Sequence, residues 1–251
     1  MNGPALRKAV VLACRQLHER GWVANHDGNV TAREAPDRFL ATPTAVSKGA
    51  VTEEMLLTVN SAGVKVAGQR QVFSEINLHM AVYQARGDVR AVVHAHPPAA
   101  TARACAGLAL AEPFLPEAVV SLGPSVPLVR FALPGPAAVA ALEPYLEAFD
   151  AVLLQSHGVL TWGGDPETAL LRLELVEHLC RIARDAAPYG GVRPLPADAL
   201  QPLLEARTRA GLGVEGRKAK QPRFMKPQDD ASHPARTPME AMRKVTGAAR
   251  E

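Results

Sequence analysis

Three histidines offer the clearest chemistry in this sequence. His94 and His96 lie at the end of an apolar run that begins at Val89, and His157 follows a second apolar run over residues 151–155. Side chains alternate between the two faces of a β-strand, so residues two apart point the same way. A single histidine at a strand end is commonly structural. The His-x-His pair, together with a third histidine, instead favours imidazoles that share one metal ion.

The number and type of these ligands indicate what the metal would do. Three protein nitrogens leave a coordination position open, which is typical of a catalytic zinc site rather than a structural one. Imidazole also suits manganese, iron and cobalt, so the sequence predicts a divalent transition metal, with Zn²⁺ as the first expectation and Mn²⁺ or Co²⁺ as alternatives.

Glu75 is the candidate acid/base residue. It stands at the start of a predicted helix, where a carboxylate commonly does no more than complement the helix dipole. Beside a metal it could act as a general base, because a bound cation acidifies the α-proton of a carbonyl compound.

Local patterns place these residues at the ends of helices and strands. The spacing predicts a helix over residues 75–86, a strand over residues 89–95 and a second compact strand over residues 151–155. Asp165-Pro166 supplies an N-cap and a first-turn proline for a long helix to about residue 185. Glycine and prolines within residues 119–131 predict a loop with short strand pieces.

A glycine-rich turn and a threonine pair could hold an anion. Gly28-Asn29 and Thr42-Pro43-Thr44 combine hydroxyl and amide side chains with backbone N–H groups, which is what an anion cradle needs. Most pairs of this kind are simply turns, so the pattern alone is weak.

Taken together, these segments resemble the class II aldolase/adducin family. The resemblance covers about residues 5–212 and rests on motifs in the family's order and spacing: Gly28–Thr31, Thr42-Pro43, Ser74-Glu75, residues 92–96 and residues 155–158. It implies an α/β fold, a single three-layer α/β/α domain over residues 1–212 with a central, mainly antiparallel sheet. It also implies a homotetramer with sites at subunit interfaces.

The resemblance assigns roles to individual residues. His94, His96 and His157 would be the zinc ligands, and Glu75 the acid/base. The positions that would bind a substrate phosphate are Gly28, Asn29, Thr42, Thr44 and Ser74.

The implied reaction is that of a zinc-dependent aldolase. It would cleave or form a carbon–carbon bond of a ketose phosphate, or of a related hydroxyketone or 2-oxo donor, through a metal-stabilised enediolate. The same site could serve a decarboxylase, dehydratase or epimerase acting on a sugar phosphate. Glutamate at position 75 favours the aldolases over the epimerases. A non-catalytic, adducin-like interaction module would not need the three histidines and Glu75, so their presence favours an enzyme.

The chain departs from the family's aldolases at several positions. Phe73 and Ala45 replace a serine and a glycine of the phosphate-binding segments. Leu128 stands in the segment where the aldolases carry the tyrosine that acts as the acid. Arg130 or His26 could supply the missing acid. These differences leave open whether the substrate is phosphorylated.

Composition limits the remaining possibilities. Of 251 residues, 47% are hydrophobic and 21% charged, which is ordinary globular usage. Three widely spaced cysteines argue against a disulfide framework. There is no secretory signal pattern and no apolar run of membrane-spanning length. We therefore expect a cytoplasmic protein that acts on a small molecule.

The C-terminal segment differs from the rest. Residues 213–251 hold nine Lys/Arg against five Asp/Glu and few large apolar residues, which predicts a basic, disordered tail. No nucleic-acid-binding module accompanies this charge, so nucleic acid is not an expected partner.

Overall fold

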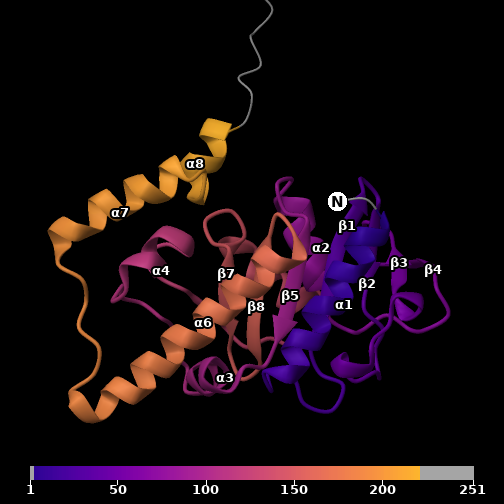
Figure 1. Cartoon of the computed structure of the whole chain (residues 1–251), viewed down its shortest axis with the longest axis horizontal. Coiled ribbons are helices and arrows are strands. Elements are labelled where there is room, and N and C mark those ends of the chain that lie inside the picture. Colours follow the sequence, from indigo (N-terminus) through magenta and orange to yellow (C-terminus); the bar gives the residue numbers. More distant parts are fainter. Residues whose placement is uncertain (1–2, 221–251) are drawn as a thin grey trace, which may run out of the picture. The chain divides into compact units, whose positions relative to one another are not determined.

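The computed structural model describes residues 3–220, and residues 1–2 and 221–251 lie outside the description. The described strands are β1 (Asn29–Ala35), β2 (Arg38–Ala41), β3 (Leu57–Val59), β4 (Lys65–Ala67), β5 (Ala91–Ala95), β6 (Leu128–Val129), β7 (Ala151–Leu154) and β8 (Gly158–Gly163). The described α-helices are α1 (Gly3–Glu19), α2 (Ile76–Ala85), α3 (Pro98–Cys105), α4 (Pro116–Ser121), α5 (Pro136–Leu142), α6 (Pro166–Ala186), α7 (Ala197–Arg209) and α8 (Gly213–Lys220) (Figure 1).

The strands form one sheet in the order β4-β3-β2-β1-β5-β8-β7-β6. Neighbouring strands are antiparallel except β6 and β7, which are parallel. Because β8 lies antiparallel between β5 and β7, those two strands run in the same direction and end at the same edge of the sheet.

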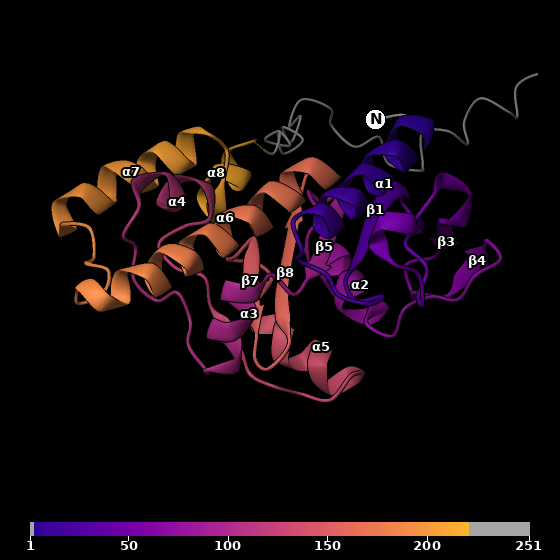
Figure 2. The same ribbon diagram turned by 60° about the horizontal axis from the view of Figure 1, so that its bottom comes forward.

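The sheet buries both of its faces. Alternate residues of β5 divide between two apolar clusters: Ala91 and Val93 pack with α1 and α6, and Val92 packs with α2 and α5. Figure 2 shows α1 and α6 on one side of the sheet and α5 on the other. The structure thus confirms the predicted α/β architecture, a mainly antiparallel sheet with helices on both faces.

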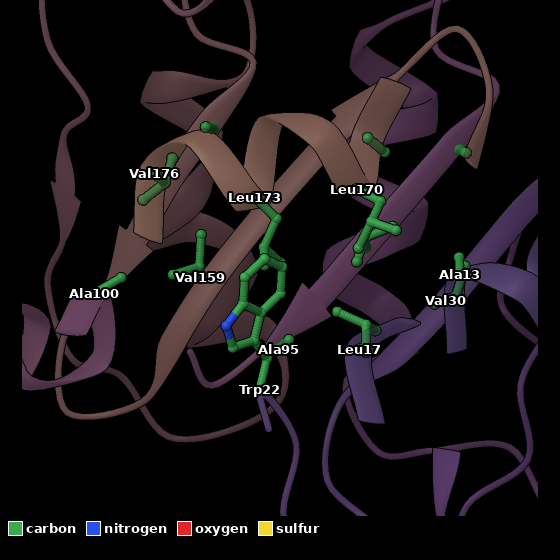
Figure 3. Close-up of a cluster of buried hydrophobic side chains, with 14 of the residues drawn as sticks. Ala13, Leu17, Trp22, Val30, Ala95, Ala100, Val159, Leu170, Leu173 and Val176 are labelled. Carbon is green, nitrogen blue, oxygen red and sulfur yellow. The ribbon is translucent and has the colours of Figure 1, made fainter. Parts of the chain in front are cut away.

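The first cluster is built from small and branched side chains around one tryptophan. Leu17 of α1, Trp22 and Leu173 of α6 meet above β5 and β8, where Ala95 and Val159 face them (Figure 3). Their close packing holds the ends of β5 and β8 together, and these ends carry His94 and the backbone next to His157.

A second set of buried polar groups lies at the opposite ends of the same strands. Asp150, 1% exposed, precedes β7 and is surrounded by four arginines. We call this set the arginine cluster; its nitrogen-to-oxygen distances to Asp150 are 2.9 Å (Arg86), 3.0 Å (Arg207), 3.5 Å (Arg172) and 3.5 Å (Arg217).

The structure differs from the sequence-based expectation in two segments. Residues 116–121 form the helix α4, ahead of the short strand β6, where a loop with strand pieces was expected from residue 119. The tail was expected to begin at residue 213, but Gly213–Lys220 form α8, and Arg217 pairs with Asp150. The predicted disorder of residues 221–251 falls outside the described residues. Within residues 3–220, no helix is both long and apolar enough to cross a membrane.

Candidate metal centre

The fold brings the three histidines to one edge of the sheet. His94 and His96 stand at the end of β5, and His157 lies in the turn between β7 and β8. Since β5 and β7 end at the same edge, residues more than sixty positions apart in the chain become neighbours. His94 is two residues from Val92, so it points to the face that α2 covers.

The three imidazoles converge on one point. One nitrogen from each of His94, His96 and His157 lies within 4.8 Å of the other two. The Nε2 atoms of His94 and His96 are 3.0 Å apart. Two nitrogens bound to one tetrahedral zinc at about 2.0–2.1 Å would be about 3.3–3.4 Å apart. The donor set therefore fits a divalent metal ion, which the histidine triad can hold.

Hydrogen bonding fixes the tautomer of His94. Its Nδ1 lies 2.9 Å from the carbonyl oxygen of Val159, and a carbonyl can only accept. Nδ1 therefore carries the proton, and Nε2 presents its lone pair to the other histidines, as metal ligation requires. Burial lowers the pKa of His94 to about 3, which keeps the ring neutral.

The position of His96 depends on a close backbone approach and a carboxylate. A side chain on Gly158 would meet the carbonyl oxygen of Ala95 and the ring of His96, both at 2.5 Å, so glycine allows the start of β8 to lie against the end of β5. On the other side of the ring, Nδ1 faces the Asp27 carboxylate at 3.7 Å. Carboxylates placed in this way orient metal-binding histidines.

Glu75 lies beside the histidines, just before the first residue of α2. His157 Nε2 is 2.7 Å from one carboxylate oxygen, and His94 Nε2 is 3.6 Å from the other. The side-chain amide of Asn29 donates to the same carboxylate at 2.8 Å. Burial alone would raise the pKa of Glu75, but its interactions with the imidazoles of His94 and His157 and the hydrogen bond from Asn29 favour the carboxylate and lower the pKa below its usual range.

The residues expected to bind phosphate lie in segments next to this centre. Pro43 bridges to Val72, and the Thr44 N–H donates to the carbonyl of Gln71, so the Thr42–Thr44 segment runs beside the one that contains Ser74. Ser74 is exposed and Thr44 is half-buried.

Other side chains of this predicted phosphate site already have partners within the protein. The Thr42 hydroxyl is buried and accepts from the Val30 N–H, and Phe73 packs edge-on against His79. A Cβ on residue 28 would collide with Val23, and φ at this position is +72°. The backbone conformation and the close packing therefore both require glycine here.

A cavity of about 240 Å³ opens beside Glu75 and His157. Its lining is mostly apolar, and Arg130 is the one lysine or arginine in it. His26, the other residue considered as a replacement acid, is exposed and does not line this cavity. No tyrosine lines it either.

Sequence reasoning missed two groups that shape the centre. Asp27 directly precedes the Gly28-Asn29 motif. An acidic side chain next to this turn could have indicated a partner for one of the histidines. The buried amine of Lys48 donates to the carbonyls of His26 and Val46, and so ties together the two loops that flank the site. A lysine between Ser47 and Gly49 gives no sign of this in the sequence.

The fold and the site together define an α/β protein with a trihistidine centre at a sheet edge, next to a helix-opening glutamate. The model for the class II aldolase and adducin N-terminal domain matches residues 8–184. The chain belongs to this family.

Curated relatives differ in the reaction that their names state. The chain is 29% identical to 3-oxo-tetronate 4-phosphate decarboxylase of Cupriavidus necator over 209 residues, 80% of this chain and 95% of the relative. It is 27% identical to L-fuculose phosphate aldolase of Methanocaldococcus jannaschii over 176 residues, 70% and 94% of the two chains. These two relatives are therefore named for different reactions.

A solved structure agrees with the fold. The crystal structure of YgbL from Klebsiella pneumoniae superimposes with a TM-score of 0.74 at 29% identity, covering 81% of this chain and 99% of YgbL.

Proposed function

We propose that this protein is a zinc-dependent lyase of the aldolase type, with His94, His96 and His157 as ligands. The observation that carries the proposal is the convergence of three imidazole nitrogens and the Glu75 carboxylate beside an open cavity. The donor set leaves room for a substrate oxygen, as catalytic zinc sites do. Manganese and cobalt are the alternatives for the same ligands.

Glu75 is the residue placed to move a proton. Its carboxylate lines the cavity, and Asn29 holds one oxygen through the side-chain amide. When bound, a divalent cation supplies positive charge that acidifies the proton on the carbon next to a carbonyl. Glu75 accepts this α-proton, and in the reverse reaction it returns the proton to the same carbon.

The proposed substrate is a ketose phosphate or a related hydroxyketone. Gly28, Asn29, Thr42, Thr44 and Ser74 remain the candidates for phosphate contacts, on the strength of the family resemblance. We also propose a homotetramer with sites between subunits, and a catalytic domain distinct from the basic C-terminal segment.

Decarboxylation is the second candidate reaction. Aldol condensation needs an acid to protonate the alkoxide formed from the acceptor aldehyde, and no tyrosine lines the cavity. Loss of CO₂ from a 3-oxo acid needs no such proton transfer at the departing group. The C. necator relative at 29% identity is a decarboxylase by name.

Metal content and product analysis test both candidates. Protein purified without chelators should contain about one zinc per chain by mass spectrometry, and His94→Ala should lose it. The zinc-loaded protein is then incubated with hydroxyketones, ketose phosphates and 3-oxo acids, and aldehyde and CO₂ are measured separately. Wild-type protein that holds no divalent ion would contradict both reactions.

Glu75→Gln tests the base. Zinc should stay bound, while exchange of the donor's α-proton with solvent should slow about 10²- to 10⁴-fold. Exchange at the wild-type rate would show that another group removes the proton.

A further inference from the structure

The cavity beside the metal centre contains one charged side chain that the proposed chemistry does not use. Arg130 lines the same cavity as Glu75 and His157. The rest of the lining is largely apolar and includes Val129, Phe131 and Leu154. A ligand in this space therefore meets both a proton-transfer group and a guanidinium.

Arg130 has no partner within the described part of the chain. It makes no hydrogen bond or ion pair with any residue from 3 to 220. The nearby Lys48 is engaged, since its amine donates to the carbonyls of His26 and Val46. The Arg130 guanidinium keeps its donors free for a ligand.

The backbone around Arg130 is nevertheless fixed relative to the metal centre. The Phe131 N–H donates to the side-chain oxygen of Gln155 at 3.0 Å. In turn, the Gln155 N–H donates to the carbonyl of Val129, also at 3.0 Å. Both neighbours of Arg130 are thus bonded to the turn that contains His157.

The predicted phosphate site does not supply this positive charge itself. The Asn29 amide is committed to Glu75, and the Thr42 hydroxyl accepts from Val30. Phe73 is buried against His79 instead of offering a hydroxyl. Ser74 and Thr44 remain as neutral donors, so Arg130 is the free cation that an anionic substrate would find in the cavity.

We infer that Arg130 sets the specificity of this site by binding an anionic group of the substrate, a carboxylate or a phosphate. Guanidinium forks match both anions with paired, charge-assisted hydrogen bonds. The cavity volume of about 240 Å³ suits a compact sugar acid or sugar phosphate. This inference rests on the proposed metal centre.

Three probes that bind metal through the same group test the inference. Glycolohydroxamate is neutral, its phosphate ester adds a phosphate, and succinate monohydroxamate adds a carboxylate. Dissociation constants are measured by calorimetry on zinc-loaded wild type and on Arg130→Gln. Arg193→Gln serves as the matched control, because Arg193 is exposed and does not line the cavity.

Arg130→Gln should weaken one or both anionic probes about 10- to 100-fold and leave the neutral probe unchanged. The probe that is weakened identifies the anion, and Arg193→Gln should alter none of the three. Equal affinities of wild type and Arg130→Gln for both anionic probes would overturn the inference, as would equal weakening of all three probes. If the zinc-loaded wild type binds none of the three probes, the proposed metal centre is itself wrong. This result differs from one in which the probes bind but Arg130→Gln has no effect.

Discussion

The strands β5, β7 and β8 carry a polar cluster at each end, and the two clusters are built on opposite principles. The histidine cluster (His94, His96, His157 and Glu75) gathers imidazole nitrogens and a carboxylate around one point beside a cavity. The arginine cluster surrounds Asp150 with guanidinium groups that also donate to backbone carbonyls. Arg86, for example, donates to Asp88, Asp150, Leu146 and Phe149.

Backbone conformation separates the two ends as well. Non-glycine residues with positive φ occur in the described chain at Asn25, Ala45 and Ser156, at +51°, +57° and +57°. Each lies in a segment that borders the histidine cluster. Strained backbone of this kind is typical of functional sites, where surrounding structure holds it in place. The comparison teaches that one end of the sheet is saturated and structural, while the other is held ready for a ligand.

Replacing Asp150 should give the largest effect on stability. Asp150→Asn leaves four arginines without their shared buried carboxylate, which should cost about 3–5 kcal/mol in the free energy of unfolding. Urea denaturation at pH 7 measures it. Asp185→Asn is the control, since both partners of its pair with Arg184 are exposed, and it should leave stability nearly unchanged.

The metal affinity of folded Asp150→Asn should equal that of wild type. A fall in zinc affinity as large as the loss in stability would mean that the two ends are coupled, and the division into a structural and a functional end would be wrong.

Asp27→Asn should act in the opposite way. Its carboxylate faces Nδ1 of His96, so losing the charge should weaken zinc binding about 10- to 100-fold, with little effect on unfolding. Competition with a chelating dye measures the affinity. Asp185→Asn again serves as the control, and unchanged affinity in Asp27→Asn would show that His96 is held by its packing against Gly158 alone.

The two ends also differ in how far the sequence predicted them. His94, His96 and His157 each follow or end an apolar run, so strand periodicity and the family resemblance together indicated that they share one metal. The arginine cluster joins residues from 86 to 217 that have no common spacing, because it depends on how α2, α6, α7 and α8 pack. Long-range packing of this kind leaves no local pattern.

The helix α4 was missed for a different reason. Gly123, Pro124 and Pro127 indicate an irregular segment, and Gly123, with φ +105°, does follow directly after the C-cap of the helix. Pro116 at its first position was the overlooked signal, since proline favours the first turn. Likewise, α8 is short and strongly charged, and it pairs Arg217 with Asp150, a contact that composition cannot reveal.

The dependence of stability on pH should differ between His79 and Asp150. Burial lowers its pKa to about 3, so between pH 6.5 and 3 the unfolded chain binds one more proton at this residue than the folded chain. Its contribution to stability therefore falls as the pH drops through this window, by about 1.4 kcal/mol per pH unit. Asp150, whose pKa is lowered, loses its contribution only below its ordinary value of 3.8.

Urea denaturation of metal-free protein from pH 6 to 4.5 tests this difference. His79→Asn should reduce the dependence of stability on pH by about one proton, whereas Asp150→Asn should leave it unchanged. The comparison uses slopes, so a general loss of stability in either variant does not obscure it. Equal slopes in wild type and His79→Asn would show that His79 titrates alike in the folded and unfolded chain.

The smallest expected effect concerns backbone strain at the histidine end. Ala45 has φ +57°, a left-handed conformation that costs a residue with a Cβ about 1–2 kcal/mol. Ala45→Gly removes that cost but gives the unfolded chain more freedom, so the net gain in stability should be about 0.5–1 kcal/mol. Gly87→Ala is the reciprocal control. It adds a methyl group at a position whose φ is not positive and where a Cβ meets nothing within 4 Å. If Ala45→Gly destabilises the protein instead, the strain at this edge of the site is not stored in the backbone of residue 45.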